Sequence, residues 1–259
     1  MIAKAITRKQ LERIENTIIV FVSIASIAGM VLSFVLVSSG VMDRVIMPVL
    51  ACVCSITGIL CSVYIARFKI IGQYLAAIHI LLFGFSCFWF GWYGMAAYFL
   101  LVRTPLAIGA IFKWSKTPNL NAALSKQLSK KGWLIVCGTT LAATVLVTGV
   151  LYLINFYFGD TLISSTYTAI ASVTGSIVLA AIIESLNITL AFAAAVLSMY
   201  MYRDNWLIWK IVNILLIVTW GVSIGFMGEA AYSAIVLIIM SFGHLANNFT
   251  GNYRWKKHL

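Results

Sequence analysis

The sequence predicts an all-α integral membrane protein with about eight transmembrane helices. Hydrophobic residues make up 62% of the 259 positions and charged residues only 10%, with a mean hydropathy of +1.01, whereas soluble domains are about a quarter charged. The apolar residues also fall in runs of about 20, the length that crosses a hydrocarbon core of about 30 Å. We expect spans at 17–38, 45–66, 71–90, 94–114, 133–156, 180–202, 206–225 and 229–249.

The positive charge of the chain lies at the ends of these spans. The net charge is +11, and the densest basic segments are the N-terminus, residues 113–131 and residues 254–257. If the N-terminus is cytoplasmic, all three segments are cytoplasmic, together with Arg67, Lys69 and Arg203, as the positive-inside rule requires. The sequence therefore predicts a multi-pass protein with both ends in the cytoplasm. Its partner is the lipid bilayer and not nucleic acid, because the basic residues flank apolar spans.

The first span and the segment before the sixth span need separate interpretation. The apolar stretch within residues 1–40 is too long for a signal peptide and lacks a small-x-small exit, so we interpret it as a retained, extra helix. Residues 157–180 are rich in Ser and Thr and only mildly apolar. They fit either an interfacial helix on the outer face or an early start of the sixth span.

An internal repeat divides the remaining spans. Residues 90–102 read FGWYGMAAYFLLV and residues 224–236 read IGFMGEAAYSAIV, and YIAR at 64–67 resembles YMYR at 200–203. Both copies have the same orientation, which indicates two parallel three-helix bundles, and transporters of this kind bind substrate between their halves. We expect an extra N-terminal helix within 1–40, a first bundle at 45–115, a linker helix at 132–158 and a second bundle at 180–250.

The strongest cluster of candidate binding residues lies in the seventh span. Trp206, Trp209 and Asn213 fall within an arc of about 60° on a helix, with about 10 Å of helix axis between the first and the last. Polar groups inside a membrane are costly and are functional candidates for that reason. A ring-bearing solute would meet two indole faces and then an amide. The alternative is an aromatic belt at Trp206, a packing Trp209 and an interhelical hydrogen bond from Asn213.

Polar residues in other spans are weaker candidates. Glu184 and Asn187 share a face of the sixth span, where a carboxylate near the outer end favours a cationic solute, although solvation explains Glu184 equally well. His79 lies deep enough in the third span to need a partner, either in a site or in an interhelical bond. The remaining candidates are Gln73, nearer the cytoplasmic end of the same span, and His244 in the last span, which solvation at the interface also explains.

Arg103 lies near the middle of the fourth span, two residues before Pro105. A guanidinium at this depth must face protein or water, and the proline can kink or hinge the helix. The sequence assigns no specific partner to Arg103.

Missing motifs exclude several function classes. The chain contains no GxxxxGK[ST], HExxH or GxSxG and no paired carboxylates for hydrolysis, so we expect neither enzyme activity nor a cofactor. The five cysteines lie in apolar runs without CxxC or zinc spacing and are interpreted as packing residues. The few carboxylates within the spans argue against a proton or sodium pump, which leaves facilitated diffusion as the simplest scheme.

The run YRDNWLIWKIVN carries the spacing W-x-x-W-x-x-x-N at Trp206, Trp209 and Asn213. It resembles the PnuC family of bacterial vitamin transporters, and the resemblance extends over about 55–115 and 184–250. The resemblance implies two three-helix bundles and a linker helix, similar to the SWEET proteins, with an extra N-terminal helix. It also implies nicotinamide riboside as substrate, carried by facilitated diffusion across the bacterial inner membrane and trapped by cytoplasmic phosphorylation.

The chemistry of this substrate matches the cluster. Nicotinamide riboside contains a flat pyridinium cation, for which a tryptophan face is the best side-chain partner, and its carboxamide matches the amide of Asn213. Where we expect asparagines in the family, this chain has His79, an apolar stretch near Ala107, and Ser241 or His244. The alternatives are transport of another vitamin, such as thiamine or riboflavin, or a membrane subunit that transports nothing. Association into a homo-oligomer is left open.

Overall fold

The computed structural model describes residues 6–38, 40–117, 125–162, 165–226 and 231–257. Within these residues the regular structure is helical, apart from one bridge between Lys126 and Tyr202. Eight of the described helical segments are long and apolar enough to cross a membrane, which confirms the predicted all-α, eight-span fold. In chain order the elements are α1 (Arg8–Leu36), the π-helix η1 (Met42–Ile46), α2 (Met47–Ala66), α3 (Ile71–Trp89), α4 (Tyr93–Ala97), the π-helix η2 (Tyr98–Arg103), α5 (Thr104–Ser115), α6 (Lys130–Leu162), α7 (Ser165–Thr174), α8 (Ile177–Met199), α9 (Asn205–Ile224) and α10 (Ala231–Lys257).

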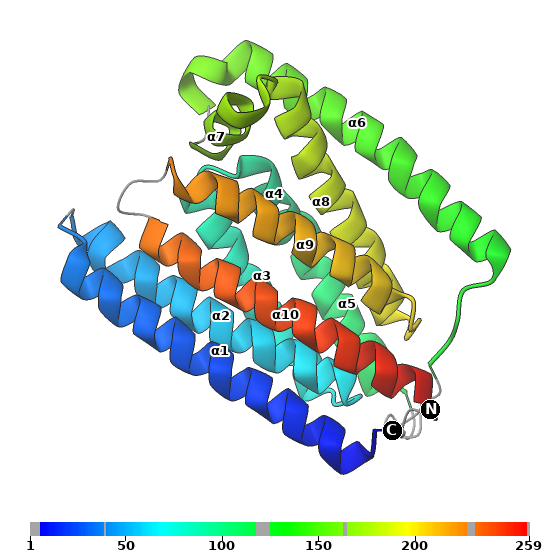
Figure 1. Ribbon diagram of the computed structural model, residues 1–259. Coiled ribbons are helices and arrows are strands. Elements are labelled where there is room, and N and C mark those ends of the chain that lie inside the picture. The colour runs from blue at the N-terminus through cyan, green and yellow to red at the C-terminus, as the bar shows by residue number, and fades with distance from the viewer. Residues whose placement is uncertain (1–5, 39, 118–124, 163–164, 227–230, 258–259) are drawn as a thin grey trace, which may run out of the picture.

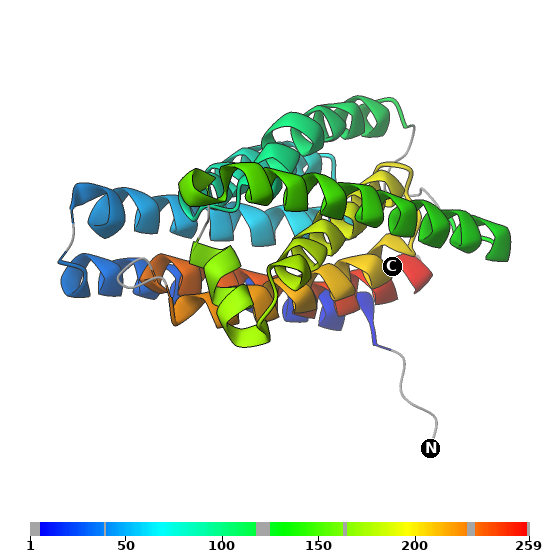
Figure 2. The ribbon, with the colours of Figure 1, turned by 90° about the horizontal axis from the view of Figure 1, so that it is seen from above.

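Six spans form a closed ring (Figure 1). In order around the ring, α2 packs against α3, α3 against α5, α5 against α8, α8 against α9, and α9 against α10, which returns to α2. The first three helices form one bundle and the last three the other, and α4 and η2 complete the span that ends in α5. Figure 2 shows the helices from above, running along a common direction.

Three helices lie outside the ring. α1 packs against α2 and α10, α6 packs against α8, and α7 packs against α8 and α9. Since α7 ends at Thr174 and α8 begins at Ile177, the sixth span does not start early. Residues 157–180 instead contain the end of α6, the separate helix α7 and the start of α8.

Small residues let α1 pack closely against the ring. A Cβ atom on Gly29 would lie 2.7 Å from Val236 Cγ2 of α10, so only a glycine permits this approach. The hydroxyls of Ser26 and Ser55 share a hydrogen bond of 2.7 Å between α1 and α2. Small residues and hydroxyl pairs are the usual means of helix association in membranes, because apolar side chains gain little by leaving lipid.

A buried carboxylate also joins α1 to both bundles. Glu15 is fully buried, and its Oε2 accepts hydrogen bonds from Arg67 Nε at 2.7 Å and from Arg254 Nη2 at 2.9 Å. Its Oε1 accepts from Arg254 Nε at 3.0 Å. Because Arg67 follows α2 and Arg254 lies near the end of α10, this ion-pair cluster connects α1 to the two ring helices that it covers.

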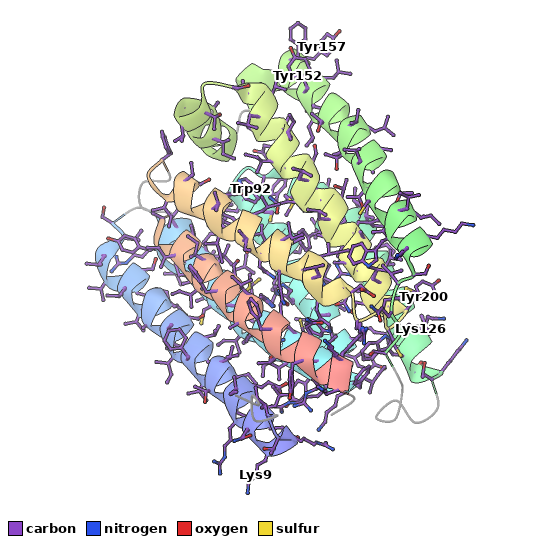
Figure 3. The ribbon with its side chains drawn as sticks, turned by 45° about the vertical axis from the view of Figure 1, so that its right-hand side comes forward. Lys9, Trp92, Lys126, Tyr152, Tyr157 and Tyr200 are labelled. Carbon is purple, nitrogen blue, oxygen red and sulfur yellow. The ribbon has the colours of Figure 1, made fainter. Side chains whose placement is uncertain are left out.

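One end of the ring carries most of the positive charge. This basic end contains the start of α1, the α2–α3 and α8–α9 turns, the end of α5, the start of α6 and the end of α10. Among the described residues, Arg44 lies at the opposite end and Arg103 in the interior, whereas the other lysines and arginines lie at or near the basic end. Figure 3 shows Lys9 and Lys126 at the basic end and Tyr152 of α6 at the other.

The two helix turns at the basic end have the same backbone conformation. Phe68 and Met201 have positive φ values of 54° and 62°, and each follows directly on the residue that caps the preceding helix, Arg67 in one bundle and Tyr200 in the other. The counterpart of Arg67 is therefore Tyr200 and not Arg203. The bundles repeat, but the match between YIAR and YMYR is out of register by three residues.

The third helix of each bundle donates a hydrogen bond to the C-terminal end of the first helix of the other bundle. Trp114 Nε1 of α5 donates to Met199 O at the end of α8 at 3.3 Å, and Trp255 Nε1 of α10 donates to Ala66 O at the end of α2 at 3.1 Å. Such reciprocal bonds follow from a twofold relation between the bundles. The second GxAAY copy falls partly on residues 227–230, which lie outside the described residues.

Candidate functional site

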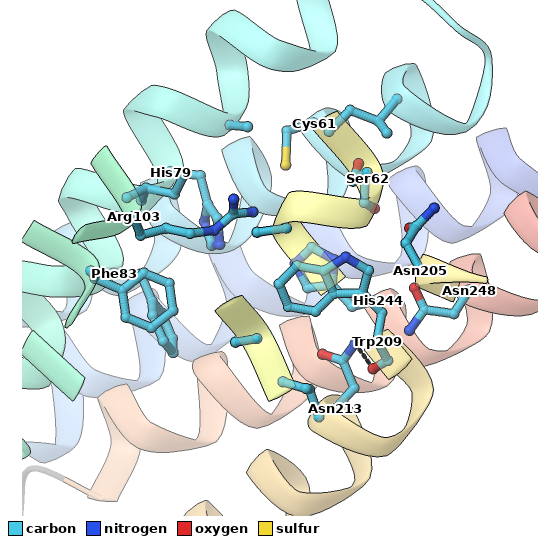
Figure 4. A pocket seen from close by; sticks show the side chains of 18 of the residues that line it. Cys61, Ser62, His79, Phe83, Arg103, Asn205, Trp209, Asn213, His244 and Asn248 are labelled. Carbon is cyan, nitrogen blue, oxygen red and sulfur yellow. Dashed lines mark hydrogen bonds between the residues drawn. The ribbon is translucent and has the colours of Figure 1, made fainter. Parts of the chain in front are cut away.

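A cavity with an empty volume of about 960 Å³ lies inside the ring, between the two bundles. All six ring helices contribute side chains to it, and Figure 4 shows several of them converging. Six of the predicted site residues line this cavity: Gln73, His79, Trp206, Trp209, Asn213 and His244.

α3 and α9 present equivalent positions to the cavity. Each helix follows one of the two matching turns, and the N–H groups of Gln73 and Trp206 make the same early turn bond, to Ile70 O and Arg203 O. With this register, every α3 residue that lines the cavity has a counterpart in α9 that also lines it, and α9 adds Asn205, whose counterpart Gly72 does not line it. The pairs are Gln73 and Trp206, Ala76 and Trp209, His79 and Val212, Ile80 and Asn213, and Phe83 and Leu216.

Trp209 and Asn213 form the centre of the predicted cluster. Trp209 is half-buried, and Asn213 lies one helical turn further along α9, where its Nδ2 donates to Trp209 O at 2.8 Å. This bond fixes the amide, and no described residue donates to its Oδ1. The Arg103 guanidinium carbon lies 5.6 Å from the centroid of the Trp209 ring, within the range of a cation–π contact. The indole thus already has a cation over its ring.

Trp206 has a different environment from Trp209. It is 2% exposed and packs edge-on against Trp255, with ring centroids 5.5 Å apart and planes at 88°. A Cβ atom on Gly251 would lie 2.7 Å from its Cη2, so a glycine makes room for the ring. Phe68 and Trp114 belong to the same aromatic cluster. Trp206 therefore borders the cavity at the basic end but offers little open ring face.

Two histidines from opposite bundles meet in the cavity. The rings of His79 and His244 have centroids 5.7 Å apart. His79 Nδ1 lies 3.1 Å from Cys54 O and 3.4 Å from Cys54 Sγ. In the tautomer that donates from Nδ1 to the carbonyl, Nε2 is an acceptor. A Cβ atom on Gly58 would lie 2.9 Å from His79 Cε1 and 3.0 Å from His244 Nε2. The absence of a side chain at Gly58 therefore creates room for both rings.

Several buried polar atoms of the cavity wall have no hydrogen-bond partner among the described residues. They are Gln73 Nε2, Arg103 Nε, Asn205 Oδ1, Trp206 Nε1 and Asn248 Nδ2. Buried polar groups in proteins are normally satisfied. Orphaned donors and acceptors that face one cavity are therefore expected to bind water or a polar solute there.

Two predicted site residues do not line the cavity. Glu184 is buried, and its Oε1 accepts a hydrogen bond of 2.8 Å from the backbone N–H of Met95 at the start of the fourth span. A carboxylate is favourable near a helix N-terminus. Asn187 is fully buried, and its Nδ2 donates to Ile183 O at 3.2 Å. On α8 these two residues share a face with Ala191 and Ala195, which line the cavity, but they lie on the turns before Ala191, the first residue of this helix in the cavity wall.

Sequence reasoning gave Arg103 no partner and did not single out Phe99. Both residues line the cavity from η2, four residues apart, and Thr104 Oγ1 donates to Phe99 O at 3.0 Å directly after this π-helix. π-Helical turns occur often at functional sites. The depth of Arg103 in its span was the only sequence signal, and nothing distinguished Phe99 from an apolar packing residue.

The chain matches the protein family described as "Nicotinamide mononucleotide transporter" over residues 48–257. The chain belongs to this family. Two relatives are nicotinamide riboside transporters PnuC. The one from Neisseria mucosa is 28% identical over 214 residues, which cover 80% of this chain and 72% of the relative, and the one from Haemophilus influenzae is 26% identical over 216 residues, which cover 80% and 79%.

A solved structure gives the same fold. The crystal structure of the vitamin B3 transporter PnuC matches with a TM-score of 0.62 and 24% identity, covering 92% of this chain and 91% of the other. The family match begins at residue 48, so it includes the six ring helices and α6. α1 precedes the segment that the family model matches.

Proposed function

We propose that this membrane protein carries nicotinamide riboside across the bacterial inner membrane. The observation that carries the proposal is the cavity between the bundles, with the half-buried Trp209 ring beside the amide of Asn213. A flat pyridinium ring can stack on the indole, and Asn213 Oδ1 can accept from the carboxamide N–H₂. The names of the two relatives favour the same substrate over thiamine or riboflavin.

The riboside's sugar has partners available in the same cavity. Ribose hydroxyls both donate and accept, so they need amides, imidazoles or hydroxyls around them. Gln73, Asn205 and Asn248 each hold an unpartnered polar atom in the cavity wall. His79 presents a free Nε2 nearby. These residues replace the asparagines that we expected at ribose-contacting positions.

Charge and chemistry suggest the orientation and the driving force. The basic end is proposed to face the cytoplasm, since cytoplasmic loops carry the excess of lysine and arginine, and this places both termini inside. The cavity wall contains no aspartate or glutamate that could bind a coupling ion. We therefore propose facilitated diffusion without catalysis by this chain, with phosphorylation of the riboside in the cytoplasm preventing its return.

Uptake by purified protein in liposomes tests this function. Labelled nicotinamide riboside should enter liposomes that contain this chain alone, and unlabelled riboside should compete better than thiamine or riboflavin. Empty liposomes are the control for leakage. If thiamine or riboflavin competes better, the cargo is another vitamin. If nothing enters although the protein is folded by circular dichroism, the chain is a subunit and not a transporter on its own.

A further inference from the structure

Arg103 is a charged group inside the cavity that the proposed function does not use. It ends the π-helix η2, and Pro105 follows in the first turn of α5. Its side chain lines the cavity together with Phe99, one turn earlier. A guanidinium at the centre of a membrane protein is costly and is a functional candidate by default.

The surroundings of Arg103 contain no compensating carboxylate. Among the described residues no aspartate or glutamate lies within ion-pair distance of it, and none of them lines the cavity. Its Nε has no hydrogen-bond partner there either. The contact that the structure gives its charge is the Trp209 ring, at 5.6 Å. The positive charge of the cavity is thus concentrated beside the indole on which a substrate ring would stack.

This arrangement places Arg103 in competition with a cationic substrate. A pyridinium that stacks on Trp209 needs the electron-rich ring face on which the guanidinium lies. The two cations also repel one another: at a separation of about 6 Å and an effective dielectric constant of about 20, the repulsion corresponds to a loss of affinity of about 10- to 100-fold.

We propose that Arg103 determines specificity by the charge of the ligand ring, because its guanidinium occupies the cation site of Trp209. Any flat ring that stacks on this face must displace the guanidinium from the indole. A positively charged ring is in addition repelled by the displaced guanidinium, whereas a ring of the same shape without charge is not. The inference rests on the proposed function, since it concerns the same indole and the same class of riboside.

The experiment compares two ligands that differ in ring charge. Nicotinamide riboside has a pyridinium ring, and its dihydro form has gained a hydride on the ring and is uncharged. Dissociation constants are measured by calorimetry on the purified full chain, its Arg103→Gln variant, which removes the charge, and its Arg103→Lys variant, which retains it. Melting temperatures show whether each variant is folded.

We expect Arg103→Gln to bind nicotinamide riboside about 10- to 100-fold more tightly, with a clearly smaller gain for the dihydro form, and Arg103→Lys to remain close to the unsubstituted protein. If Arg103→Gln binds the charged riboside equally or more weakly while folded, the proposal is overturned.

A measurement on the unsubstituted protein tests the proposal without relying on the folding of any variant. We expect it to bind the dihydro form at least as tightly as the pyridinium form, whereas a clear preference for the cation would contradict a resident competitor on Trp209. If neither riboside binds any of the folded proteins, the proposed function fails, and with it the basis of this inference.

Discussion

α3 and α9 present the same five helical positions to one cavity, but the chemistry of the two helices differs. Where α9 has Trp209 and Asn213, α3 has Ala76 and Ile80 at the equivalent positions. The polar contribution of α3 comes from other positions of the same helix face. The duplicated fold thus contributes matching helices from both bundles to the cavity. The indole and the amide that are proposed to recognise an aromatic solute, however, both lie in the second bundle.

The comparison predicts the largest loss of affinity at Trp209. Trp209→Ala removes the indole face and should weaken binding of nicotinamide riboside by about 2–3 kcal/mol, because a desolvated cation–π contact and ring stacking are both lost. Calorimetry on the purified protein measures the change. Leu207→Ala, on the same helix but about half exposed on the outside, is the matched control and should leave the affinity unchanged. Equal losses in both variants would contradict the placement of the site.

A smaller loss is expected at Asn213, one turn further along α9. Asn213→Leu keeps the branched shape of the side chain but replaces the amide by two methyl groups, and the lost ligand hydrogen bonds should cost about 1–2 kcal/mol of binding free energy. Ile80→Val makes a mild change at the equivalent position of α3 and should change the dissociation constant by less than about twofold, since Ile80 offers only apolar contact. If the two substitutions weaken binding equally, the asymmetry between the helices does not determine recognition.

The polar residues that α3 presents to the cavity can be tested through Gly58 of α2, without substituting a residue that lines the cavity. Gly58→Ala would place a Cβ atom within about 3 Å of both imidazoles, His79 and His244, and such overpacking costs about 1–3 kcal/mol of stability. We expect a lower melting temperature and a loss of riboside affinity smaller than that of Asn213→Leu. Gly138→Ala, whose Cβ atom would meet nothing within 4 Å, should show neither effect.

The smallest effect on affinity is expected outside the ring, at Glu15 of α1. Glu15→Gln leaves Arg67 and Arg254 without their carboxylate, and breaking a buried ion pair destabilises a protein by about 3–5 kcal/mol. The melting temperature should therefore fall while the riboside affinity of the folded protein stays the same. Glu12→Gln removes an exposed pair with Arg8, worth at most about 1 kcal/mol. A large change in affinity for Glu15→Gln would mean that α1 shapes the cavity.

Much of this organisation could be predicted from the sequence, because membrane spans are governed by length and hydropathy. Trp209 and Asn213 could be predicted as neighbours, since their spacing fixes them on one helix face. Their environment could not be predicted. Trp206 is covered by Trp255, a residue far away in the chain, and Glu184 accepts a hydrogen bond from the backbone N–H of Met95.

The register of the repeat and the direction of Arg103 also depend on the folded backbone. The similarity of YIAR and YMYR aligned Arg67 with Arg203. The positive φ values of Phe68 and Met201 show instead which residues occupy equivalent positions in the two turns. Arg103 lies in the cavity wall beside Trp209, and no periodicity in the sequence indicates the π-helical turn that it ends.

The reciprocal indole bonds of Trp114 and Trp255 have a consequence for how such a molecule can be divided. Each bundle completes the other, since the last carbonyl of a first helix needs a partner that its own helix does not supply. A bundle expressed alone would be left with an orphaned tryptophan donor and an orphaned carbonyl, and these are the groups that a second bundle satisfies. The two halves are therefore expected to be stable only as a pair.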